Sequence, residues 1–154
     1  MVNISLSRYL KLAHQPTRAQ ILKYIRRSLI QRYQNVMINV AIVDVIQSQE
    51  MNLAYRNIDK PTNVISLEYA SSRDNFNFLS GELILCDEVI VSEANQQGKN
   101  IAAHYAHMII HGVLHLQGYD HQNDHDAEEM EQLEIEILQT LNFNNPYLEV
   151  YETI

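Results

Sequence analysis

Three histidines near residue 115 have the spacing of a metal-binding site. His111 and His115 are four residues apart, so on a helix their imidazoles lie one above the other on the same face. Gly118 follows, and a glycine can adopt the positive φ that ends a helix and turns the chain back, which would bring His121 to the same point. Three imidazoles, with a fourth position left for water, are typical of a catalytic zinc site. The spacing predicts metal ligands at these three histidines.

The residue after the first histidine separates this motif from that of the metalloproteases. The long zinc-protease motif has the same histidine and glycine spacing. Those enzymes place a glutamate directly after the first histidine as the general base, whereas this chain has Gly112. Peptides are therefore disfavoured as substrates. A metal-dependent hydrolase of another substrate and a non-enzymatic protein with a structural metal remain open at this point.

Two more histidines, His104 and His107, continue the same stripe towards the start of the helix. Each fits two interpretations: a contact to a metal ligand or the wall of a cleft, or simple packing in the core. His125 lies among acidic residues before the last helix and is expected to be exposed. The spacing alone does not choose between the two roles for His104 and His107.

The elements that must hold this motif predict a small α+β fold. No repeat or linker interrupts the 154 residues, so we expect one domain over residues 1–154. Strands and helices are interspersed without strict alternation, which favours a small mixed sheet covered by helices. Periodicity and turn residues place the strands at 2–6, 37–43, 63–67 and 81–86, and the helices at 16–33, 49–56, 87–98, 101–117 and 126–141. Ser48 is expected to cap the second helix, and residues 70–79 to form a polar surface loop.

The net charge of −8 is unevenly distributed. Residues 1–43 hold seven Lys or Arg and no acid, whereas residues 101–154 hold ten acids and no Lys or Arg. The basic segment is a candidate RNA-contacting surface, with a solvated helix face as the alternative. The acidic face of the last helix would repel phosphate and is expected to point away from the substrate or towards a basic protein. Its acids are Glu128, Glu129, Glu131, Glu134 and Glu136.

Cysteine content and hydropathy point to a cytoplasmic protein. The single cysteine, Cys86, cannot form an internal disulfide and follows an apolar run, so we expect it in the core. No stretch approaches the ~20 apolar residues that are needed to span a bilayer. We therefore expect no membrane partner.

The histidine motif and two further segments resemble the YbeY endoribonucleases, a bacterial family of ribosomal-RNA maturation factors. The motif runs from Ala103 to His121. The other segments are Leu53-Ala-Tyr-Arg56 continuing to Asp59-Lys-Pro-Thr-Asn-Val-Ile-Ser66, and Gly81-Glu-Leu-Ile-Leu-Cys86. The resemblance covers about residues 36–147. Glu82 and the pair Leu67-Glu68 differ from the residues that are common in the family. These differences leave the metal motif intact and bear on the exact shape of the substrate cleft.

The resemblance implies a zinc-dependent, single-strand-favouring endoribonuclease with one zinc ion per chain. It implies action on ribosomal RNA, notably maturation of the 16S rRNA 3′ end, a part in ribosome quality control, and contacts with ribosomal proteins or ribosome-associated factors. By matching position, His111, His115 and His121 are the metal ligands, and Arg56 is the family's functionally important arginine. We assign catalytic roles to His111 and Arg56, because the planar guanidinium can grip phosphate oxygens in pairs. Thr62 and Asn63 are candidate substrate contacts, with turn chemistry as the alternative.

Overall fold

A mixed four-stranded sheet forms the centre of the fold. The structure is a computed structural model and describes residues 1–71 and 77–148. The strands are β1 (Val2–Arg8), β2 (Asn35–Val43), β3 (Val64–Ser71) and β4 (Phe78–Cys86), and their order in the sheet is β1-β2-β4-β3. β1, β2 and β4 are parallel, and β3 pairs antiparallel with β4 at the edge of the sheet.

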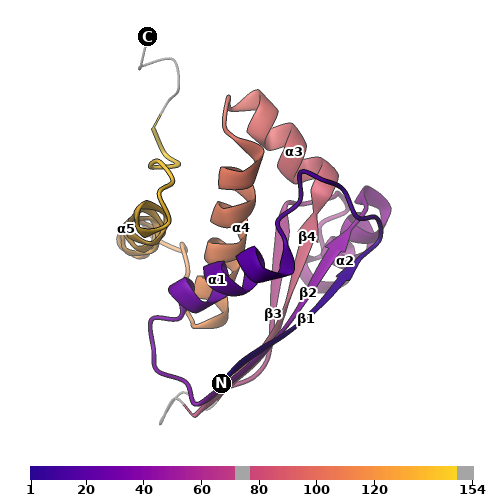
Figure 1. The fold of residues 1–154 in the computed structure, drawn as a ribbon. Helices are drawn as coiled ribbons and strands as arrows, with labels where there is room; N and C mark the ends of the chain where they lie inside the picture. Colours follow the sequence, from indigo (N-terminus) through magenta and orange to yellow (C-terminus); the bar gives the residue numbers. More distant parts are fainter. Residues whose placement is uncertain (72–76, 149–154) are drawn as a thin grey trace.

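Helices cover both faces of this sheet (Figure 1). One face carries α1 (Arg18–Ser28) and α4 (Ile101–Leu116), while α5 (Asp124–Thr140) packs against the side of α4 that is turned away from the sheet. α3 (Asp87–Gln96) follows β4 and packs against α4. α2 (Val45–Arg56) lies over the opposite face. The described residues therefore form the α+β arrangement that the sequence predicts.

Alternation along the strands divides the apolar side chains between two cores. Ile38 and Ile42 of β2 belong to the larger core, which α1 and α4 close. Ile65 and Ile84 point to the other face and pack with Met51 of α2. Fully burying one such aliphatic side chain contributes about 1.5–3 kcal/mol, so the larger core holds α4 firmly on the sheet. Cys86 is buried, as predicted.

The helix predicted over 16–33 is wrong at its C-terminal end, because α1 stops at Ser28. A side chain from another helix ends it. The Gln117 amide donates to the Ser28 carbonyl at 2.6 Å, and its oxygen accepts from the Ile30 backbone N–H at 2.8 Å. Gln117 thus satisfies backbone groups that a longer helix would have paired internally.

Two other predicted boundaries also move. α2 begins at Val45 rather than at residue 49, because the Asp44 carboxylate accepts the Gln47 backbone N–H and caps the helix. Ser48 is buried inside α2, where its hydroxyl donates to the Thr62 carbonyl at 3.0 Å. β3 and β4 take up both ends of the loop predicted over 70–79, and its centre, residues 72–76, lies outside the described residues.

No helix in the described ranges has the length and apolar character to cross a membrane.

Candidate metal centre

α4 carries two of the three predicted ligands, and local sequence fixes both of its ends. The Asn100 side chain caps the N-terminus by accepting from the Ala102 backbone N–H at 2.8 Å. At the other end Gly118 has φ 98°, a left-handed conformation that glycine adopts without steric cost. The chain turns there, as the sequence predicts, and carries His121 back towards the helix.

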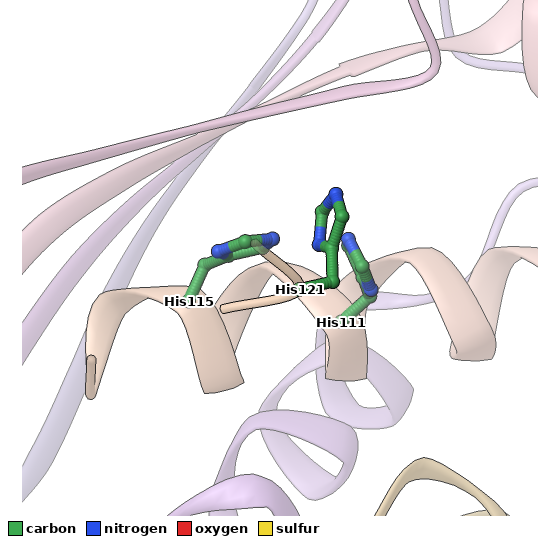
Figure 2. A group of neighbouring side chains, drawn as sticks. All are labelled: His111, His115 and His121. Carbon is green, nitrogen blue, oxygen red and sulfur yellow. The ribbon is translucent and has the colours of Figure 1, made fainter. Parts of the chain in front are cut away.

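The turn brings His121 to the two helical histidines. Figure 2 shows the three side chains gathered on one side of α4. Each offers a ring nitrogen, and these atoms all lie within 4.8 Å of one another. The ring centroids of His111 and His115 are 4.7 Å apart, and those of His115 and His121 are 5.3 Å apart. The predicted convergence of His111, His115 and His121 is present.

The environment of His115 favours the neutral imidazole, which is the form that binds metal. Burial lowers the pKa of His115 to about 4, and the neighbouring His111 and His121 lower it in the same direction. Exposure increases from His111, whose side chain is 24% exposed, to His121 at 59%. His121 therefore forms the open side of the cluster.

A buried carboxylate holds the other side of His111. Glu134 of α5 is 0% exposed, and its Oε2 lies 2.6 Å from His111 Nδ1. Its Oε1 lies 2.6 Å from His107 Nε2 and also accepts the Tyr147 hydroxyl. Burial alone would raise the pKa of the Glu134 carboxyl, but the hydrogen bonds from His107 and His111 hold it well below its usual value.

Glu134 therefore corrects one prediction from the sequence. The acids of the last helix were expected to share one exposed face, yet Glu134 points inwards. It lies four residues after Met130 and three before Ile137, both buried, so it belongs to the packing stripe of α5. An acid on such a stripe needs a buried donor. The spacing of Glu134 from Met130 and Ile137 could have shown from the sequence that this acid is buried, but it was grouped with the exposed acids of the helix.

His104 repeats this arrangement near the start of α4. It is 4% exposed, and its Nε2 lies 2.9 Å from Glu93 Oε1 of α3. Glu93 also accepts from the Asn63 side-chain amide at 3.1 Å. His104 and His107 are thus both buried and both paired with an acid from a neighbouring helix. His107 is linked to the three-histidine cluster through Glu134, whereas His104 is hydrogen-bonded to α3.

The other predicted site residues lie around the start of β3. Arg56 is the last residue of α2, and its guanidinium donates to the Val64 carbonyl at 3.3 Å. Burial and the two neighbouring histidines are the main causes of the low pKa of His115, and the positive charge of Arg56 lowers it slightly further. Within the described residues, Asn63 directs its amide to Glu93, while the Thr62 backbone pairs with Ser48. Arg56 is thus the predicted substrate residue with an electrostatic link to the cluster.

The basic residues of the N-terminal segment divide into two groups. Three of them donate to backbone carbonyls of the fold: Arg8 to Pro16, Arg18 to Ile4 and Arg27 to Thr140. The other four are exposed: Lys23 and Arg26 on α1, and Lys11 and Arg32 outside it. Part of this charge therefore stabilises the fold, and part of it faces solvent.

Gly112 explains why this motif carries no glutamate after its first histidine. A Cβ atom at this position would lie 2.7 Å from Leu83 Cδ2 and 3.1 Å from Ser66 Oγ. The Ser66 hydroxyl donates to the Gly112 carbonyl at 3.1 Å. The position faces the sheet at close range, so there is no room for the general base of a metalloprotease.

Comparison with known proteins agrees with this geometry. Residues 5–142 match the family model described as endoribonuclease YbeY. The chain belongs to the YbeY family. The match includes most of the N-terminal residues that the resemblance over 36–147 left out. The solution structure of TM1509 from Thermotoga maritima is similar over 91% of this chain and 92% of that one, with a TM-score of 0.53 and 22% identity. That likeness concerns the fold.

Membership of the YbeY family makes this chain an endoribonuclease, a hydrolase of phosphodiester bonds with RNA as its substrate. The two departures from common YbeY residues lie opposite each other, since Leu67 on β3 is paired with Glu82 on β4. The neighbouring Tyr69 donates its hydroxyl to the Glu82 carboxylate. These departures therefore belong to one local contact on the sheet and leave the three histidines of the YbeY motif unchanged.

Proposed function

We propose that this protein is a zinc-dependent endoribonuclease that favours single-stranded RNA and processes ribosomal RNA in the cytoplasm. Its proposed tasks are maturation of the 16S rRNA 3′ end and ribosome quality control, carried out by one domain that comprises the whole chain. The observation that carries this proposal is the convergence of three imidazoles on one point in a chain of an endoribonuclease family.

The donor set fits zinc. Three imidazole nitrogens with an open fourth position are the ligand set of catalytic zinc sites, and the low pKa of His115 keeps that ring neutral at physiological pH. One ion held by His111, His115 and His121 would polarise a phosphoryl oxygen and lower the pKa of its bound water to about 7. In this proposal the catalytic role of His111 is to bind the zinc ion.

Arg56 is the proposed phosphate-binding residue. The hydrogen bond to Val64 uses one guanidinium nitrogen and leaves other N–H groups for a substrate. Burial lowers the pKa of Arg56, but a guanidinium stays protonated at any working pH. In this proposal the positive charge of Arg56 neutralises a phosphate bound beside the cluster.

Thr62 and Asn63 are proposed to contact the backbone or a sugar of the RNA, because they lie between Arg56 and the start of β3 in the chain. The exposed Lys23 and Arg26 on α1 are proposed to bind RNA phosphates further from the cleavage point. The exposed acids of α5 would repel RNA, so that face is proposed to meet basic ribosomal proteins or ribosome-associated factors.

Cleavage of a single-stranded fragment from the 16S rRNA 3′ end by zinc-loaded protein tests the proposal. We expect His115→Ala to lose both zinc and cleavage. We expect Arg56→Ala to keep zinc but lose about 10²–10³-fold in rate, the usual cost of removing one group that stabilises developing charge. His125→Ala, which alters an exposed histidine outside the cluster, is the matched control.

Three outcomes would contradict the proposal. A purified protein that binds no stoichiometric zinc would remove the metal centre. Full cleavage by folded His115→Ala would show that any metal there is structural. Cleavage of peptides instead of RNA would assign the site to another class of hydrolase.

A further inference from the structure

We infer that Glu134 is the positioning residue for the metal ligand His111: it fixes the tautomer and orientation of that imidazole and thereby sets the affinity of the three-histidine site for metal. The inference rests on the proposed function, because it takes the three histidines as metal ligands. It adds a residue from α5 to a site that the motif confines to α4 and the turn after it.

The hydrogen bonds determine which nitrogen His111 offers to the cluster. An ionised carboxylate only accepts hydrogen bonds, so the contact of Glu134 Oε2 with His111 Nδ1 requires a proton on Nδ1. A neutral imidazole then has its lone pair on Nε2. The carboxylate thus directs the metal-binding lone pair of His111 away from α5.

The surroundings of Glu134 identify it as a positioning group and exclude a role as general base. The side chain is fully buried, and its two oxygens accept from His107, His111 and Tyr147. These donors come from α4 and from the segment after α5. To reach a substrate or become a fourth ligand, the carboxylate would have to break these hydrogen bonds, so it leaves the fourth position free.

Replacing the carboxylate by an amide is a sharp test of this role. In Glu134→Gln one of the two carboxylate oxygens becomes an NH2 group that only donates, so either His107 or His111 loses the acceptor that it now faces, and the negative charge is lost. Loss of such an outer partner typically weakens metal binding 10–100-fold. Zinc affinity is measured by competition with a chelator. Glu136→Gln, at an exposed position on the same helix, is the control and should bind zinc like the unchanged protein.

A second measurement reads the tautomer directly and does not depend on a variant. In the metal-free protein, nitrogen chemical shifts of His111 should report a proton on Nδ1 and none on Nε2. A group that only filled space would not impose this tautomer.

The inference is overturned if His111 carries its proton on Nε2, or if folded Glu134→Gln binds zinc as tightly as the unchanged protein. If Glu134→Gln does not fold, the tautomer of the unchanged protein decides. The two proposals can fail separately: a protein that binds no zinc contradicts the proposed function, whereas equal zinc affinity in Glu134→Gln contradicts the role of Glu134.

Discussion

The two ends of α4 use the same residue type at similar spacing for different purposes. Towards its N-terminus, His104 and His107 are 4% and 6% exposed, and each is paired with a carboxylate from a neighbouring helix. Towards its C-terminus, His115 has histidines as its ring neighbours and is more accessible. The groups that face a histidine therefore decide whether it pairs with an acid in the core or leaves a ring nitrogen free for a metal ion.

His111 lies at the boundary between these two regions. Its Nδ1 contacts Glu134, as a core histidine would, and its ring also lies beside those of His115 and His121. The two regions are therefore connected through this residue. Variants on either side should separate metal binding from stability.

The largest effect is expected at the exposed side of the cluster. His121→Ala should weaken zinc binding by more than about 100-fold, because even the partners of metal ligands contribute 10–100-fold. The stability of the metal-free protein should change by less than about 0.5 kcal/mol, since this side chain is 59% exposed. Chelator competition and urea unfolding measure the two quantities. A large loss of stability would place His121 with the core histidines instead.

An intermediate effect is expected where α4 meets the sheet. Gly112→Ala gains up to about 1 kcal/mol in helix propensity, but its methyl group would meet Leu83 and Ser66. Overpacking of this kind costs about 1–3 kcal/mol, so we expect a net loss of about 1 kcal/mol in urea unfolding and displacement of the histidines. Unchanged or higher stability would show that α4 can move away from the sheet freely.

The smallest effect is expected in the pH dependence of the core pair. Burial would raise the pKa of Glu93, but hydrogen bonds from His104 and Asn63 lower it below its ordinary value of 4.5. Its contribution to stability is therefore present above pH 4.5 and is lost as the pH falls through the lower folded pKa. We expect the stability difference between the unchanged protein and Glu93→Gln, below about 1 kcal/mol, to shrink over that range. A difference that grows on acidification would contradict this sign.

Local signals explain what could be predicted from the sequence. The four-residue spacing of His111 and His115, with Gly118 after them, is a property of one helix and its end, and the structure confirms both. The end of α1 was mispredicted because its capping group, Gln117, is 89 residues away from Ser28 in the chain. Such a contact depends on how α1 packs against α4, which periodicity does not describe.

Glu134 lies between these two cases. Its place on the packing stripe of α5 is a local signal, but its histidine partners come from α4 and Tyr147 comes from the segment after α5. Residues 101–154 contain no Lys or Arg, so within this segment the ionisable donors open to a buried acid are His and Tyr, and these are the residues that Glu134 contacts. A charge count that described the segment as uniformly acidic concealed this pairing.

The position of Glu134 in the chain has a consequence for biosynthesis. Ribosomes release a chain from its N-terminus, so α4 emerges before Glu134, which follows His111 by 23 residues. A nascent chain that has exposed His107 and His111 still lacks the Glu134 carboxylate that pairs with both of them. With the role proposed for Glu134, full metal affinity would be acquired late in synthesis, after α5 has docked on α4.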